Sequence, residues 1–124
     1  YTFTKAILEN QPIQIYNQGS MRRDFTYIDD IVEGIIAAID REFPNALFNL
    51  GHHRPEELLH MLAVLEKELG CKANRIMLPM QPGDVVATYA DIKESTQELH
   101  FVPKTSLEEG LAHFVRWYKD YHHP

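Results

Sequence analysis

One helical segment most constrains the fold of this chain, because it lies between short segments whose apolar residues have the spacing of strands. Five leucines share the spacing of one helix face: Leu58, Leu59, Leu62, Leu65 and Leu69. Pro55 suits the first turn of this helix, and Gly70 suits a left-handed cap at its end. The alternating segment 13–16 and the apolar runs 47–50 and 75–78 instead predict short strands. Helices interspersed with short strands predict a mixed α/β fold.

Further helices are predicted from capping residues and apolar periodicity. A helix is already under way at residue 1, because no capping residue precedes it. Asp29 can cap a second helix, and a capping box of Ser106 and Glu109 begins a long final helix. A short helix is expected over about 91–99 and a strand over about 23–28. The helix at Asp29 is predicted to face the core through one stripe: Ile28, Val32, Ile35, Ile36 and Ile39.

Size and charge narrow the classes of function. The 124 residues, 44% of them hydrophobic, suffice for one core but not for a cofactor domain plus a substrate domain. Eighteen acidic and twelve basic side chains give a formal charge of −6, so anions are expected only at a local cationic site and nucleic acid is not an expected partner. No apolar run reaches the ~20 residues of a membrane span, and the first residues do not have the pattern of a signal peptide. A single cysteine, Cys71, excludes an intrachain disulfide and fits a reducing compartment, so we expect a soluble cytoplasmic protein.

Two polar clusters are the leading candidate sites. In the first, a turn at residues 17–20 delivers Arg22 and Arg23 to the start of a strand, where alternation sends them to opposite faces. One of them can act as a bidentate donor to phosphate while the other stays in solvent; a solvated pair is the alternative. In the second, Gln81-Pro82-Gly83-Asp84 predicts a type II turn. Its aspartate can accept hydrogen bonds from a vicinal diol or simply stabilise the turn.

Other candidates have simpler explanations. Tyr1 and Lys5 have the Tyr-x-x-x-Lys spacing of a catalytic pair, but no glycine-rich loop or serine surrounds them. The pairs His52-His53 and His122-His123 lack a neighbouring cysteine or carboxylate at metal-ligand spacing. Cys71 has no activating partner, and helix capping accounts for Asp29-Asp30. We therefore predict no catalytic and no metal-ligating residue.

Several ordered motifs resemble the C-terminal part of extended short-chain dehydrogenases/reductases, the NAD-dependent epimerase/dehydratase family, and most closely its UDP-glucuronate 4-epimerases. The likeness covers nearly all of the chain. The run MQPGDV is what favours the glucuronate epimerase branch. The matching segments are IQIYN (13–17), RDFTYIDDIVEGI (23–35), FNLG (48–51), LPMQPGDV (78–85), TYADI (88–92), PKTSLEEG (103–110) and FVRWY (114–118).

The resemblance implies that residues 1–124 are a small nucleotide-sugar-binding C-terminal region with pieces of the Rossmann-domain edge, and that the N-terminal NAD-binding Rossmann domain is absent. It also implies a role for each matching position. Arg23 contacts the diphosphate of a UDP-sugar, Asp84 the ribose hydroxyls, and the backbone around Ile15 and Tyr16 the uracil. Gln81 stands where relatives often have an arginine. The expected partner is a UDP-sugar such as UDP-glucuronate or UDP-galacturonate.

The parent enzyme implied by the resemblance oxidises the sugar at C4 with bound NAD, lets the keto intermediate rotate, and returns the hydride to the other face. NAD is expected in the parent and not in this fragment, which is expected to be inactive alone and to self-associate through faces that the missing half would cover. Three alternatives stay open. The parent could be a UDP-sugar decarboxylase or dehydratase; the chain could be a non-catalytic sensor of nucleotide sugars; or it could be an interaction module.

Overall fold

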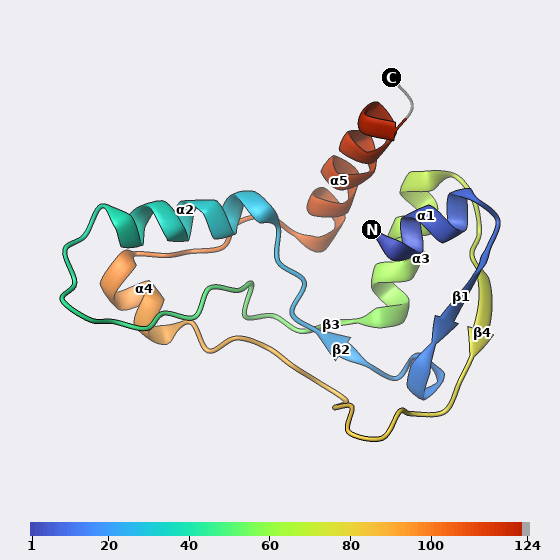
Figure 1. Cartoon of the computed structure of the whole chain (residues 1–124), viewed down its shortest axis with the longest axis horizontal. Helices are drawn as coiled ribbons and strands as arrows, with labels where there is room; N and C mark the ends of the chain where they lie inside the picture. Colours follow the sequence, from blue (N-terminus) through green and yellow to red (C-terminus); the bar gives the residue numbers. More distant parts are fainter. Residues whose placement is uncertain (123–124) are drawn as a thin grey trace.

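The computed structural model, which describes residues 1–122, contains two groups of helices joined by long loops and a two-residue strand pair (Figure 1). One group holds α1, α3 and α5 beside the strands β1 and β4, and the other holds α2 and α4. The elements in chain order are α1 (Thr2–Leu8), β1 (Pro12–Ile15), the 3₁₀ segment η1 (Tyr16–Gly19), β2 (Arg22–Arg23), α2 (Ile28–Ile39), β3 (Glu56–Glu57), α3 (Leu58–Leu69), β4 (Asn74–Met77), α4 (Lys93–Leu99) and α5 (Leu107–His122). The predicted mixed α/β fold is confirmed.

The larger hydrophobic core lies in the first group. β1 and β4 pair in parallel, with Pro12 opposite Asn74 and Ile15 opposite Met77. Alternation along β1 buries Ile13 and Ile15, which pack against the apolar faces of the helices. The buried members of this core are Ile7, Ile13, Ile15, Leu62, Leu65, Leu69 and Val115.

The leucine helix is confirmed as α3. Gly70 follows it with φ 77° and ψ 14°, which is the left-handed conformation that the sequence predicts, and its N–H donates to the Glu66 carbonyl at 3.0 Å. Pro55 precedes the helix by three residues instead of lying in its first turn, because residues 56–57 form β3, which pairs antiparallel with β2.

An ionic cluster ties α3 to β4. The Glu66 carboxylate, 1% exposed, accepts hydrogen bonds from Arg75 at 2.8 Å, Lys72 at 2.9 Å and the Ala73 N–H at 3.0 Å. Burial would raise the pKa of Glu66, but these hydrogen bonds outweigh it and lower that pKa to about 2. The buried charge of Glu66 is thus compensated by Arg75 of β4 and by Lys72 and Ala73 of the loop before it.

The second group has a smaller core of Ile92, Leu99 and Phe101. α2 packs on it through small residues, since Ala37 and Ala38 contact this cluster. A Cβ at Gly34 would lie 2.7 Å from the Leu50 side chain, so the glycine permits the close approach.

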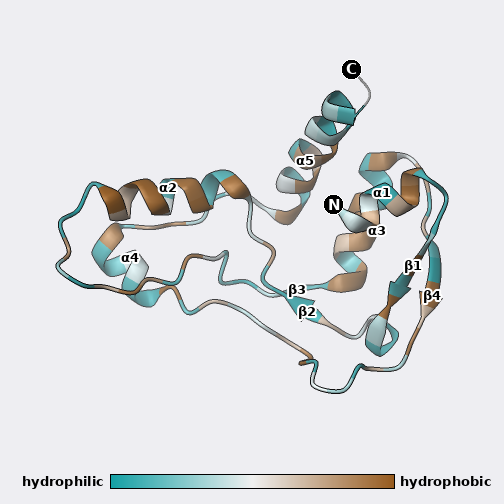
Figure 2. Cartoon of the chain, viewed as in Figure 1, coloured by the Kyte–Doolittle hydropathy of each residue, from teal (hydrophilic) through white to brown (hydrophobic). Residues whose placement is uncertain are grey.

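The large side chains of α2 overturn the prediction that this helix faces the core through them. Ile28, Val32, Ile35, Ile36 and Ile39 are 42–75% exposed. Figure 2 shows α2 as largely hydrophobic, with a hydrophilic stretch in its first half. The sequence pattern identified the helix correctly, but it could not show that the small residues, and not the large ones, meet the neighbours present in this chain.

Three local predictions are also wrong. Residues 47–50 form no strand, and Leu47 is 85% exposed, because among the described residues no strand lies beside this segment to pair with it. The strand expected over 23–28 is only Arg22–Arg23, and Ile28 already begins α2. Asp29 is not the N-cap, which is Tyr27; it lies inside the first turn, where a negative charge still favours the helix dipole.

The ends of the chain behave largely as predicted. α1 begins at Thr2, and the Glu109 N–H donates to Ser106 Oγ at 3.2 Å, which is one half of the expected capping box. α4 begins at Lys93, whose N–H donates to the Asp91 carboxylate at 3.1 Å.

Among residues 1–122 we find no helix that combines the length and the apolar character of a membrane span.

Candidate functional site

The first part of the site is a tight turn that follows β1. Asn17, Gln18 and Gly19 have φ of 49°, 52° and 81°, three left-handed residues in a row. Left-handed backbone is costly for side chains other than glycine, and such strain gathers at functional sites. The Asn17 side chain supports the turn by donating to the Ser20 carbonyl at 2.8 Å. A Cβ at Gly19 would lie 2.6 Å from Leu59 Cδ2, so this turn rests directly on α3.

The second part is β2, which carries the two arginines. The loop at residues 86–88 runs beside β2: Arg22 N donates to the Val86 carbonyl at 2.8 Å, and Thr88 N donates to the Arg22 carbonyl at 3.2 Å. Arg22 is exposed, and its guanidinium donates to the Pro55 carbonyl at 3.0 Å. Arg23 leaves the strand on the other side and is half-buried. The predicted division between one solvated and one sheltered arginine is confirmed.

The third part is the Pro-Gly turn. Asp84 N donates to the Gln81 carbonyl at 3.2 Å and Gly83 has φ 83°, which together make the predicted type II turn. Asp84 Oδ1 accepts hydrogen bonds from Val85 N at 2.8 Å and from Arg23 Nη2 at 2.9 Å. The two leading candidates, 61 positions apart in the sequence, therefore form one ion pair, with side chains that are 28% and 30% exposed.

The pair has hydrogen-bonding capacity left for a ligand. Arg23 Nη1 donates to the Arg22 carbonyl at 2.9 Å and to the Val86 carbonyl at 3.4 Å, which orients the guanidinium, and its five N–H donors exceed what Asp84 and these two carbonyls use. Asp84 Oδ2 accepts no hydrogen bond from residues 1–122. A fixed guanidinium beside a carboxylate with an open oxygen can bind an anion and a hydroxyl group side by side.

The remaining predicted contact residues are Gln81, Ile15 and Tyr16. Gln81 is exposed at the first position of the Pro-Gly turn. Ile15 is fully buried, and its carbonyl accepts from Leu78 N at 2.8 Å, so its side chain serves the core. Tyr16 is half-buried, and its hydroxyl donates to Gln14 at 2.8 Å. Of these three residues, Gln81 and Tyr16 have side chains that solvent can reach.

Asp24 is a structural member of the site that we did not predict. Its Oδ2 accepts hydrogen bonds from His53 N at 3.0 Å and from Ala90 N at 2.9 Å, so it joins two loops to the end of β2. A Cβ at Gly51 would lie 2.8 Å from that oxygen. The only sequence signal is that Asp24 follows Arg23 in the strand direction and therefore points to the other side.

The other candidates are not brought into this site. Tyr1 Oη lies 3.3 Å from His122 Nε2, whereas Lys5 Nζ lies 3.9 Å from Glu9. Asp30 is buried and accepts from the backbone N–H of Lys104 and of Thr105, so it holds the loop before α5.

Metal and thiol chemistry gain no support. Cys71 is exposed and free. Among residues 1–122, no group of three or more His, Cys, Asp or Glu side chains could hold a metal ion, and His123 lies outside the described residues.

The residues present do not fit a dinucleotide cofactor. Such a cofactor binds where a glycine-rich turn leads from a strand directly into a helix. The chain has six glycines, all within residues 1–122, and none of them opens a helix after a strand. Residues 1–122 thus lack the glycine turn of a dinucleotide-binding domain.

Comparisons with known proteins agree with the motifs. Residues 2–51 match the NAD dependent epimerase/dehydratase family. The chain is 46% identical over 118 residues to uncharacterized protein MJ1055 of Methanocaldococcus jannaschii, and this match covers 95% of this chain and 36% of that protein. It is 39% identical over 139 residues to UDP-glucuronate 4-epimerase 1 of Arabidopsis thaliana, covering 98% of this chain and 32% of that enzyme.

A solved structure extends the likeness to three dimensions. UDP-glucuronic acid 4-epimerase from Bacillus cereus, in complex with UDP-glucuronic acid and NAD, superposes with a TM-score of 0.86 at 32% identity. The match covers 97% of this chain and 39% of that enzyme. The chain thus spans well under half the length of each relative named here. The predicted resemblance is confirmed: nearly the whole chain is similar, in sequence and in fold, to part of the UDP-glucuronate 4-epimerases of the NAD dependent epimerase/dehydratase family.

Proposed function

We propose that this chain grips the UDP moiety of a nucleotide sugar as the C-terminal substrate-binding region of an NAD-dependent UDP-sugar 4-epimerase. The observation that carries the proposal is the Arg23–Asp84 pair, held at 2.9 Å by two segments that are distant in sequence. The likeness to UDP-glucuronate 4-epimerases favours an epimerase over a decarboxylase or a dehydratase.

In this proposal each member of the pair has its own task. Arg23 donates to the diphosphate oxygens, with its guanidinium already oriented by the Arg22 carbonyl. Asp84 accepts from the ribose hydroxyls through Oδ2. Gln81 borders the diphosphate from the Pro-Gly turn, and the backbone at Ile15 and Tyr16 borders the uracil. The binding energy of the UDP moiety then orients a sugar whose chemistry takes place elsewhere.

The same proposal assigns the oxidation and the NAD site to a part of the enzyme outside these residues, which is supported by the absence of a dinucleotide-binding glycine turn. It also accounts for the exposed stripe of α2 and the unpaired segment 47–50: both would pack against that part. This chain alone would then bind no NAD, and it would self-associate. A cytoplasmic location remains a prediction that is supported by the single free cysteine.

Titration of the intact protein with UDP tests the proposal. We expect Arg23→Ala to weaken UDP binding by about 1.5–3 kcal/mol, the range for a hydrogen bond to a charged group. Arg22→Ala removes the same charge one residue away, from a side chain that faces solvent, and should change the affinity little. Calorimetry that gives equal affinities for wild type and Arg23→Ala would refute the assignment of Arg23.

A further inference from the structure

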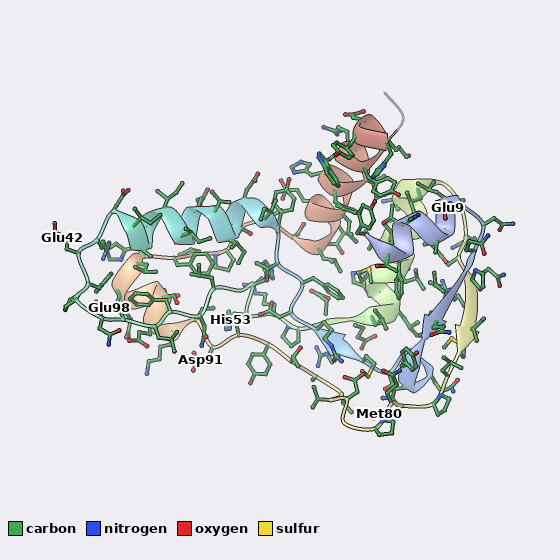
Figure 3. All side chains as sticks on the ribbon, in the orientation of Figure 1. Glu9, Glu42, His53, Met80, Asp91 and Glu98 are labelled. Carbon is green, nitrogen blue, oxygen red and sulfur yellow. The ribbon has the colours of Figure 1, made fainter. Side chains whose placement is uncertain are left out.

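A cavity lies away from the Arg23–Asp84 pair. It has a volume of about 530 Å³ and is bounded by the loop 52–54, the start of α4 and the segment 101–104. Figure 3 labels two of the residues that line it, His53 and Asp91. Neither Arg23 nor Asp84 lines this cavity, so it is separate from the site described above.

Positive charge predominates in the lining of this cavity. Arg54, Lys93 and Lys104 line it, against a single lining carboxylate, Asp91. Lys104 is bound to Glu33 at 2.9 Å, whereas Arg54 and Lys93 form no ion pair with any residue from 1 to 122. In a chain whose formal charge is −6, two cationic side chains without an ion-pair partner at one cavity are a local site for an anion.

A buried polar atom at the same cavity also lacks a partner. His52 lines the cavity, and its Nδ1 is shielded from solvent without a hydrogen bond to any described residue. Buried polar atoms in folded proteins are normally hydrogen-bonded, and an unpaired one costs about 1–3 kcal/mol. Because His52 lines the cavity, its ring resonances can report a ligand that binds there.

The rest of the lining is apolar. Ile92 and Phe101 are buried members of the smaller core, and Val102 and Pro103 continue the wall. A ligand that fits both parts has a compact anionic group and a flat apolar body.

We propose that this cavity binds a small phosphate-bearing organic molecule, whose phosphate meets Arg54 and Lys93 while its apolar part lies on Val102 and Pro103. A phosphate has the charge to match two cations and enough acceptor oxygens to bind both. The site is independent of the UDP-binding proposal, because the two share no residue.

Titration of the isotope-labelled chain with phenyl phosphate, followed by NMR at the ring of His52, tests this site. We expect a saturable shift of the His52 ring resonances, weaker binding of inorganic phosphate at the same residues, and no response to phenol. The double variant Arg54→Gln/Lys93→Gln should weaken phenyl phosphate binding at least tenfold.

Two controls separate this site from general charge effects and from the first site. Lys5→Gln/Lys119→Gln removes two positive charges outside the cavity, and Arg23→Ala removes the proposed diphosphate contact. Both variants should bind phenyl phosphate as wild type does, as measured by the shift of the His52 ring resonances. The proposal is overturned if the His52 ring does not respond to phenyl phosphate, if it responds equally to phenol, or if either control weakens binding as much as the double variant does. The phenol comparison uses wild-type protein, so it decides even if the double variant does not fold.

Discussion

At the scale of single residues, Arg23 and Asp84 already hold each other in place before a ligand arrives. Both side chains are about one-third exposed, and an ion pair at such a surface contributes only about 0–1 kcal/mol to stability. In our proposal a diphosphate therefore takes over donors of the guanidinium at little cost, while hydrogen bonds to backbone groups keep both side chains in position.

Asp84→Asn should reduce the preference of the intact protein for ribose. The aspartate accepts both ribose hydroxyls in our proposal, and an accepted hydrogen bond to a charged group is worth about 1.5–3 kcal/mol. We therefore expect wild type to bind UDP about tenfold or more tightly than 2′-deoxy-UDP, and Asp84→Asn to lose most of this preference. Parallel calorimetric titrations measure the ratio. Asp91→Asn, outside the site, should keep it, and an unchanged ratio in Asp84→Asn would show that this carboxylate does not contact the ribose.

The sequence predicted these two residues but not their arrangement. Arg23 and Asp84 came from a turn pattern, from strand alternation and from the family resemblance. Their contact spans 61 positions, and it depends on the loop at residues 86–88 running beside β2, which no local pattern encodes. Asp24 was missed for the same reason, since the amides that it binds belong to His53 and Ala90.

At the scale of elements, the turn after β1 joins the site to α3 through Gly19. Gly19→Ala should destabilise the protein by about 2–4 kcal/mol, because it adds a left-handed side chain and forces Leu59 to move. Gly70→Ala is the matched control: its φ is also positive, but nothing lies within 4 Å of its added Cβ, so only the backbone term of about 1–2 kcal/mol applies. Urea denaturation compares the two, and equal losses would exclude a close contact between this turn and α3.

The Glu66 cluster makes the contact between α3 and β4 sensitive to pH. The folded-state pKa of Glu66, about 2, lies below the ordinary value of 4.5. The carboxylate therefore contributes fully to the stability of the folded protein above about pH 4.5, and this contribution is lost as the pH falls towards 2. Glu66→Gln should lower the free energy of unfolding at neutral pH by about 1–2 kcal/mol, since the partners are partly exposed.

The pH dependence identifies the carboxylate that is responsible. The difference in unfolding free energy between wild type and Glu66→Gln should shrink between pH 4.5 and 2. Glu9→Gln, at an exposed pair with Lys5, should follow wild type throughout. A constant difference over this range would mean that Glu66 titrates normally in the folded protein.

Elements were predicted well where their own residues determine them. α3 and α5 each have an apolar face and a neighbour within this chain, and each has one terminal signal that is confirmed: Gly70 after α3 and Ser106 before α5. Segment 47–50 has the composition of a strand, but a strand exists only beside another one, and no partner lies next to it among the described residues. In α2 the helix was predicted correctly and its buried face was not, because eight of its twelve residues are apolar and the small Ala37 and Ala38 compete with the large side chains for the core.

At the scale of the whole molecule, the two groups of helices differ in how much of their apolar surface the rest of the chain buries. The group around β1 and β4 has the larger buried core, although Trp117 and Tyr121 of α5 are exposed, whereas α2 turns Ile35, Ile36 and Ile39 to solvent. Burying such a side chain fully is worth about 1.5–3 kcal/mol, so several of them on one helix face provide a strong drive to associate. The chain spans under half of its relatives, so further protein is the natural cover for this face in our proposal.

The chain on its own should therefore self-associate through α2. We expect wild type to exceed the monomer mass of 14.4 kDa at high concentration in sedimentation equilibrium, and Ile36→Glu or Ile39→Glu to shift it towards monomer, because a charge at a buried apolar contact is costly. Val102→Glu serves as the control: Val102 is exposed to a similar extent as Ile36 but lies outside α2, so it should leave the association unchanged. A monomeric wild type at every concentration, or equal dissociation by Val102→Glu, would remove α2 as the contact and with it the main structural support for a missing covering domain.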